Sequence, residues 1–86
     1  MKRKQMICRL AILIAEYNTS HAAESGFRKL TIKSLSDKTG IARTTLTRLD
    51  RGVVYRIDSS TVVGLCDFFG CALADLLTLQ ETEVSD

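Results

Sequence analysis

The sequence predicts an all-α domain of five short helices, and three observations lead to that class. The 86 residues include no proline and only five glycines, which disfavours a turn-rich β-sandwich or barrel. Apolar residues recur at steps of three and four along most of the chain. Residues with capping or helix-stopping chemistry stand between these stretches. A chain of this length forms one small domain, which we place at residues 1–79, followed by an acidic flexible tail over residues 80–86.

The first helix is expected at about residues 5–17, where Ile7, Leu10, Ile14 and Tyr17 keep helical spacing. Residues 18–29 show no clear period, so we expect an extended, mobile loop, with helical character around residues 22–25 left open. The basic N-terminus followed by apolar residues resembles a signal peptide, but Arg9 interrupts the apolar run. The remaining run is too short to span a membrane, and we expect a cytoplasmic protein.

The next two helices have clear local signals. Thr31 can cap a second helix, and Gly40 can end it in a left-handed conformation. A third helix is expected over about residues 43–49. Ser36 is the small residue that a crossing of these two helices requires, and apolar anchors stand on both sides of the turn. These anchors are Leu35, Ile41, Leu46 and Leu49. The arrangement fits a helix-turn-helix at about residues 31–50, although any helical hairpin also offers glycine and spaced leucines.

Asp58 can cap a fourth helix that Gly70 ends, and residues 72–78 are expected to form a short fifth helix. The C-terminal leucines exceed what one short helix can bury, so they either pack in the core or form a dimer interface. These leucines are Leu73, Leu76, Leu77 and Leu79.

The outward side of the third helix distinguishes a DNA-reading helix from a solvated one. It carries threonines, which are poor helix formers, and arginines, with Asp50 as its only acid. Short hydroxyls permit close approach to bases, and guanidinium groups can bind guanine or phosphate. The outward residues are Arg43, Thr44, Thr45, Thr47, Arg48 and Arg51.

Charge divides unevenly along the chain. All twelve Lys and Arg lie in residues 1–56 against four acids, a net +8, and residues 57–86 carry six acids and no Lys or Arg. This asymmetry indicates that the N-terminal part meets a polyanion. Lys2, Arg3 and Lys4 could form an arm on phosphates or an unstructured, solvated tail.

Residues 30–52, LTIKSLSDKTGIARTTLTRLDRG, resemble the helix-turn-helix of lambda-repressor-like (Cro-type, XRE family) regulators. The stretches ICRLAILIAEYN and RIDSSTVVGLCDFFGCALADLL are similar to the first, fourth and fifth helices of the compact single-domain branch. The resemblance covers roughly residues 6–79. It implies a five-helix domain that binds double-stranded DNA and regulates transcription, commonly as a homodimer on a palindromic operator.

The resemblance also implies roles for individual residues. Base contacts are expected from Arg43, Thr44, Thr45, Thr47 and Arg48. Phosphate contacts are expected from Thr31, Lys33, Arg51 and Arg56, and the extended loop adds Arg28 and Lys29 as candidates. Ile32 stands where members often have glutamine, which removes one side-chain phosphate contact. The sequence does not give the operator, the regulated genes or the direction of regulation, although a repressor is the expectation.

The alternative function is a protein-interaction module of the same fold, such as an antitoxin-like or anti-repressor partner that lacks its own DNA specificity. An enzyme is not expected, because the sequence has no histidine-centred nucleophile, no glycine-rich phosphate loop and no compelling carboxylate pair. Three cysteines without a C-x-x-C pair and a single histidine, His21, do not form a zinc motif. We therefore expect no metal and no cofactor.

Overall fold

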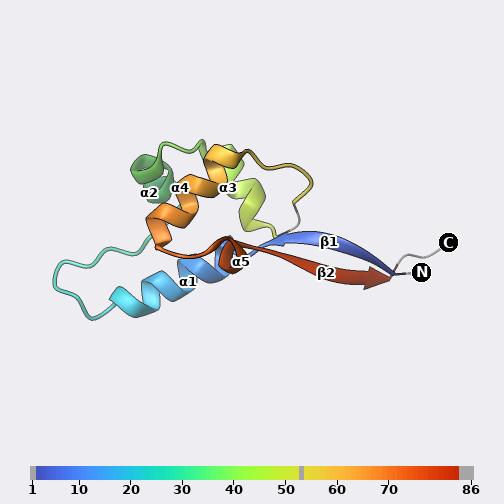
Figure 1. Ribbon diagram of the computed structural model, residues 1–86. Coiled ribbons are helices and arrows are strands. Elements are labelled where there is room, and N and C mark those ends of the chain that lie inside the picture. Colours follow the sequence, from blue (N-terminus) through green and yellow to red (C-terminus); the bar gives the residue numbers. More distant parts are fainter. Residues whose placement is uncertain (1, 53, 84–86) are drawn as a thin grey trace.

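The computed structural model describes residues 2–52 and 54–83, and this part of the chain forms five helices and a two-stranded antiparallel sheet (Figure 1). The elements follow in the order β1 (Lys2–Cys8), α1 (Leu10–His21), α2 (Ile32–Thr39), α3 (Arg43–Asp50), α4 (Ser59–Phe69), α5 (Leu73–Leu76) and β2 (Leu77–Glu83). The helices form a body, and the two strands extend from it as a ribbon, so the molecule measures 53 × 24 × 20 Å. The five helices are confirmed, but the prediction of an all-α fold is wrong because of the sheet.

A leucine core joins the five helices. Each helix contributes at least one side chain with no more than 2% of its surface exposed, and burying a leucine stabilises a fold by about 1.5–3 kcal/mol relative to leaving it in water. These side chains are Leu10, Leu35, Leu46, Leu49, Leu65 and Leu76. Leu35 of α2 and Leu46 and Leu49 of α3 belong to this core, which therefore holds these two helices against each other.

The predicted first helix begins too early. Residues 2–8 form β1, which pairs with β2 so that Lys2 lies opposite Glu83 and Cys8 lies opposite Leu77. At the base of the ribbon, the Cys8 N–H also donates to the Gly52 carbonyl at 2.6 Å, and the Met6 carbonyl accepts from the Val54 N–H at 3.0 Å. These long-range bonds use backbone groups of Met6 and Cys8 that a further helical turn would need, and α1 begins at Leu10 and continues to His21.

The connection between α1 and α2 is extended, as predicted, but it begins after His21 rather than at residue 18, and residues 22–26 form turns without a further helix. Asn18 fixes its far end. The Asn18 side chain donates to the Leu30 carbonyl at 3.2 Å, and its oxygen accepts from the Leu30 N–H at 2.7 Å. Because Leu30 is buried, this pair of bonds holds the start of α2 against α1.

At the C-terminal end, α5 is shorter than predicted and β2 begins directly after it. Residues 80–83 of the predicted flexible tail belong to β2, because they pair with residues 2–5, and residues 84–86 lie outside the described residues. The four C-terminal leucines do not form one face. Leu76 is buried and Leu77 packs against the core, whereas Leu73 and Leu79 are 56% and 63% exposed on different elements.

Within the described residues, no helix combines the length and the apolar character that a membrane span requires.

Candidate nucleic-acid interface

The turn between α2 and α3 begins at Gly40. Its φ of 75° lies in the left-handed region, which glycine adopts without the steric cost that a Cβ brings, and its N–H donates to the Ser36 carbonyl at 2.8 Å. Thr31 begins α2 with a capping box, in which its hydroxyl accepts from the Ser34 N–H and the Ser34 hydroxyl accepts from the Thr31 N–H. Both predicted boundaries of this helix are confirmed.

The hydroxyl groups of Ser36 and Thr39 stabilise the turn between α2 and α3 through hydrogen bonds. The Ser36 hydroxyl donates to the Ile41 carbonyl at 2.6 Å, and the Thr39 hydroxyl donates to the Leu35 carbonyl at 2.7 Å. The Ile41 N–H in turn donates to the Thr39 hydroxyl oxygen at 3.3 Å. Ser36, expected only as a small residue at the helix crossing, therefore also bonds directly to the chain that leads into α3.

Helix α3 turns an apolar side inward and a polar side outward. Leu46 and Leu49 are 0% and 2% exposed, and they anchor the helix to the core. Thr45 is half-buried at the flank. The remaining candidates for base contact are exposed, and they are Arg43, Thr44, Thr47 and Arg48. The helical period therefore separates the anchors from the polar residues as the sequence predicts, except that Thr45, predicted to be exposed, is half-buried.

The exposed residues of α3 surround a shallow hollow of about 330 Å³, which Arg43, Thr44, Thr47, Arg48 and Arg51 line. Thr45 does not belong to it. Instead, Thr45 borders a smaller hollow of about 230 Å³ between α3 and the start of α4, together with Arg56, Ile57 and Asp58 among others. The structure thus gathers four of the five candidates for base contact on one surface, with Arg51 at its edge.

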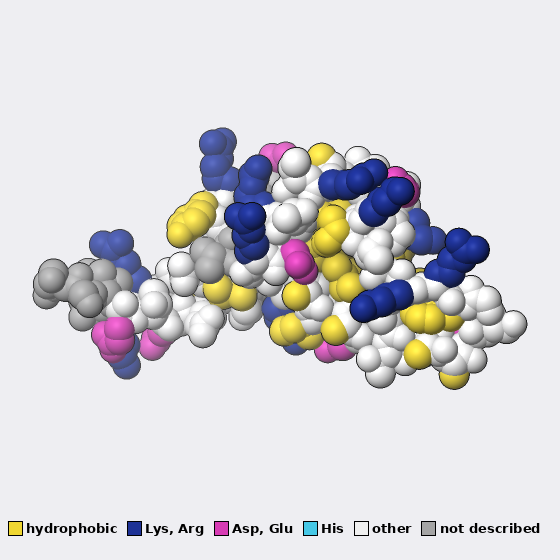
Figure 2. All heavy atoms as spheres, turned by 180° about the vertical axis from the view of Figure 1, so that it is seen from behind, with side chains coloured by type: hydrophobic (Ala, Val, Ile, Leu, Met, Phe, Trp, Pro, Cys, Tyr) yellow, Lys and Arg dark blue, Asp and Glu magenta, His cyan; other side chains and the backbone are white. Residues whose placement is uncertain are grey.

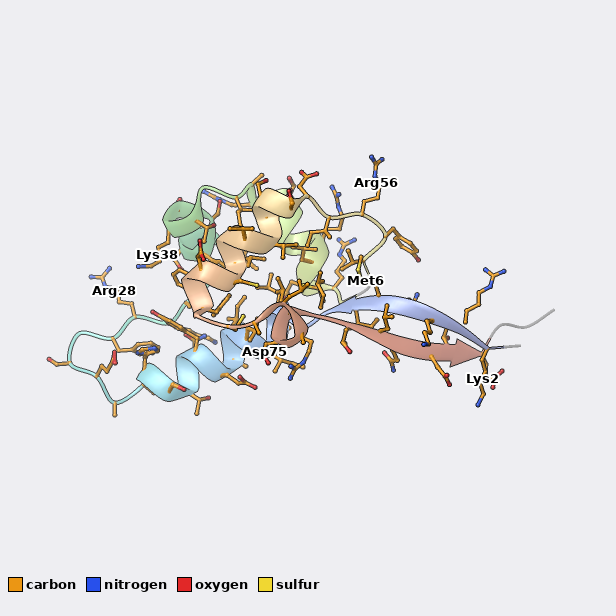
Figure 3. All side chains as sticks on the ribbon, viewed as in Figure 1. Lys2, Met6, Arg28, Lys38, Arg56 and Asp75 are labelled. Atoms are coloured by element: carbon orange, nitrogen blue, oxygen red, sulfur yellow. The ribbon has the colours of Figure 1, made fainter. Side chains whose placement is uncertain are left out.

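The loop between α3 and α4 adds a second basic surface. Arg56 extends outward from this loop (Figure 3), and with Arg48 and Arg51 it borders a hollow of about 440 Å³. Tyr55 also lines this hollow, and 86% of its surface is exposed. An exposed aromatic ring beside three guanidinium groups suits contact with a sugar-phosphate strand.

The remaining candidates for phosphate contact lie around α2. Lys33 is exposed on its first turn. Arg28 and Lys29 lie beside the start of the helix, where they line a hollow of about 380 Å³ together with Lys38. Figure 3 shows Arg28 and Lys38 extending from the end of the body remote from the ribbon. Lys38 was not among the predicted site residues, although its exposed position on α2, in the turn before Gly40, is a signal that the sequence offers.

The charge of these surfaces is not neutralised internally. In the described part of the chain, no carboxylate forms an ion pair with any arginine or lysine of α2, α3 or the two adjoining loops. Figure 2 shows Lys and Arg side chains along the upper part of the body, over the helix-turn-helix. By contrast, Lys2 and Lys4 lie on β1 opposite Glu83 and Glu81, so part of the N-terminal charge meets acids from the C-terminal segment.

Cys8 and Cys71 have the properties of packing residues. Burial raises the pKa of the Cys8 thiol, and burial together with the neighbouring Cys66 raises the pKa of the Cys71 thiol. A raised pKa keeps a thiol protonated and weakly nucleophilic at neutral pH. Among the described residues, no cluster of three His, Cys, Asp or Glu side chains could hold a metal ion.

The family model of the Cro/C1-type HTH DNA-binding domain matches residues 26–82. The match includes the basic residues before α2, the complete helix-turn-helix, α4, α5 and nearly all of β2. No curated protein and no solved structure matches the chain. The matched region contains the turn at Gly40 and the basic outward side of α3, and the chain therefore belongs to the Cro/C1-type helix-turn-helix family of DNA-binding regulators.

Proposed function

We propose that the protein is a sequence-specific regulator of transcription that reads double-stranded DNA with α3 in the major groove. The observation that carries this proposal is the outward side of α3, where arginines and threonines surround one hollow and no carboxylate pairs with the arginines in the described part of the chain. An α-helix fits the width of the major groove, and the base edges there differ for every base pair.

Roles follow from position along α3. Arg43 and Thr44 lie at its N-terminal end, which enters the groove first in this docking geometry. Arg43 and Arg48 can each donate two hydrogen bonds to the O6 and N7 atoms of guanine, while Thr47 can contact a base edge or a thymine methyl group. Thr45 is half-buried, so it contacts bases from the flank of the helix.

The surrounding basic residues position the protein on the two phosphate strands. Arg51 and Arg56 follow α3 and contact one strand. Residues near the start of α2 contact the other strand. These are Thr31, whose hydroxyl also caps the helix, Lys33, Arg28 and Lys29.

We further propose that the protein acts as a homodimeric repressor on a palindromic operator. A single α3 reads only a few base pairs, and a two-fold dimer doubles the site while keeping both helices on one side of the duplex. Repression needs no additional surface, because a bound dimer excludes polymerase from the DNA that it covers.

Selection of bound sequences from a random DNA pool tests this function. We expect a palindrome, and we expect affinity to fall steeply with salt because each phosphate contact releases condensed counterions. Arg43→Ala is expected to weaken operator binding by about 1–3 kcal/mol and to relax specificity at one position of each half-site. If the folded protein enriches no sequence, the interaction-module alternative replaces DNA reading.

A further inference from the structure

Tyr55, in the loop between α3 and α4, is the most exposed large hydrophobic side chain of the described residues, with 86% of its surface in solvent. Within this part of the chain its ring contacts no other aromatic ring, and its hydroxyl forms no hydrogen bond. A tyrosine that stabilises a fold buries most of its ring and usually bonds through its hydroxyl. Packing of the body therefore does not account for Tyr55.

The loop that carries Tyr55 is held in place although the side chain is free. The preceding residue, Val54, is 5% exposed, and its N–H donates to the Met6 carbonyl at 3.0 Å. Two residues earlier, the Gly52 carbonyl accepts from the Cys8 N–H at 2.6 Å. Figure 3 shows Arg56 and Met6 on the side of the body from which the ribbon extends. Because β1 and the core anchor the backbone on which Tyr55 stands, binding of a ligand there requires little ordering of the loop.

The surface beside Tyr55 combines apolar area with positive charge. Leu49 and Val54 supply the apolar lining of the hollow of about 440 Å³ that Tyr55 borders. Among the described residues, no Asp or Glu lines this hollow, and three guanidinium groups do. These belong to Arg48, Arg51 and Arg56. A complementary ligand must therefore offer apolar and negatively charged groups side by side.

A sugar-phosphate strand of DNA has this combination, since each deoxyribose presents C–H groups between two negative phosphates. Position also favours DNA as the occupant. Arg48 and Arg51 line both this hollow and the hollow on the outward side of α3, so the two surfaces are continuous. A duplex that receives α3 in its major groove carries one of its strands past the end of the helix and along this loop.

We propose that the ring of Tyr55 packs against a deoxyribose of this strand, between phosphates that Arg51 and Arg56 contact. The inference rests on the proposed function and deepens it by adding an uncharged contact to the phosphate contacts. Because the contact is with the backbone, it strengthens binding without distinguishing sequences. Because the ring carries no charge, it releases no counterion and does not contribute to the salt dependence.

Three variants of the full chain test the contact, with a DNA duplex of mixed sequence as the probe. Tyr55→Ala should weaken binding roughly three- to ten-fold, the effect expected from burying about half of an aromatic side chain. The slope of log affinity against log salt should stay unchanged. Arg56→Ala should instead reduce that slope by about one. Tyr55→Phe, which keeps the ring and loses the hydroxyl, should bind within about two-fold of the parent protein.

Ile12→Ala is the matched control. Ile12 is also an exposed apolar side chain, at 45%, but it lies on α1, which is drawn below α2 and α3 in Figure 1. This variant should bind DNA like the parent protein. Thermal melting should show the same stability for Tyr55→Ala as for the parent protein, because substitutions of exposed side chains change stability little.

Hydroxyl-radical footprinting read by mass spectrometry tests the contact without a substitution. Adding the duplex should protect Tyr55 from oxidation and leave Ile12 unchanged. Protection of Tyr55 that increases with protein concentration in the absence of DNA would overturn the proposal and assign the hollow to a second copy of the chain.

Two further results of the binding measurements would overturn the proposal. Unchanged binding by Tyr55→Ala would remove the contact, and equal losses in Tyr55→Ala and Tyr55→Phe would assign it to the hydroxyl rather than to the ring. If the parent protein binds DNA in either case, the proposed function stands and this inference alone fails. A folded parent protein that binds no DNA would overturn both.

Discussion

The helix-turn-helix and the terminal ribbon are held together across very different distances along the chain. In the segment from α2 to α3, the bonds that shape the turn join close neighbours, as when Ser36 donates to Ile41 or Gly40 donates to Ser36. In the ribbon, Lys2 lies opposite Glu83 and Cys8 opposite Leu77. The helix-turn-helix is therefore specified locally, whereas the ribbon exists only when residues 2–8 meet residues 77–83.

The two regions also differ in what their positive charges face. The arginines of α3 have no carboxylate partner in the described part of the chain, and the lysines of β1 lie opposite glutamates of β2. Basic side chains are thus available to a polyanion in one region and offset by acids in the other. A count of charge along the sequence cannot separate these cases.

The largest expected effect comes from the core beneath the helix-turn-helix. Leu46 is fully buried, and Leu46→Ala should lower the free energy of unfolding by about 2–5 kcal/mol because it removes packing and leaves a cavity. Thermal melting measures this loss. The matched control is Val63→Ala on α4, where the side chain is 57% exposed and a change within about 0.5 kcal/mol is expected. Equal effects of the two substitutions would contradict the core assignment.

Two glycine-to-alanine substitutions should change the free energy of unfolding in opposite directions. Gly40→Ala forces a Cβ into the left-handed region and should cost roughly 1–2 kcal/mol in unfolding free energy. Gly64→Ala in α4 should stabilise by roughly 0.5–1 kcal/mol, since alanine favours a helix interior. A Cβ there would lie 3.5 Å from Ile41 Cδ1, which is an ordinary van der Waals contact. Denaturant titration of both variants compares them, and a stabilising Gly40→Ala would show that the turn has another conformation.

Lysines from the two regions should differ in DNA binding. Lys33→Ala should weaken binding to all sequences alike and reduce the slope of log affinity against log salt by about one. Lys4→Ala should leave that slope unchanged, because Lys4 lies on β1 opposite Glu81. Titrations of a labelled operator at several salt concentrations measure both slopes. A reduced slope for Lys4→Ala would indicate that the ribbon also contacts DNA.

The smallest expected effect concerns the charges across the ribbon. Lys4→Glu places a carboxylate opposite Glu81 and should destabilise the protein by about 0.2–1 kcal/mol at low salt. Because both side chains are exposed, added salt should diminish the loss. Adding Glu81→Lys should restore the melting temperature. If the double variant does not regain the melting temperature, the charges at positions 4 and 81 do not interact across the two strands.

Most of the helical body could be predicted because its signals are local. Thr31 and Gly40 mark the ends of α2, and the spacing of Leu46 and Leu49 fixes which side of α3 faces the core. The exposed residues of α3 follow from the same period, so their grouping around one hollow could also be anticipated. Their contacts with bases and phosphates stay predictions.

The ribbon could not be predicted for physical reasons. Residues 2–8 lack the alternation of a half-buried strand, and Ile7 continues the helical spacing of Leu10 and Ile14. Pairing with β2 decides the conformation, and that partner is almost a full chain length away. The division of the C-terminal leucines between two elements could not be predicted either, since the change from α5 to β2 at Leu77 sends Leu76 into the core and leaves Leu79 exposed.

The antiparallel pairing of β1 with β2 has a consequence for the order of folding. During synthesis β1 is made first, yet its partner strand emerges only after every helix has been made. Closing so long a loop carries an entropic cost that only the completed pairing offsets. The helix-turn-helix can therefore form before the ribbon, and a chain interrupted after α4 would contain the complete helix-turn-helix while lacking both α5 and the strand that pairs with β1.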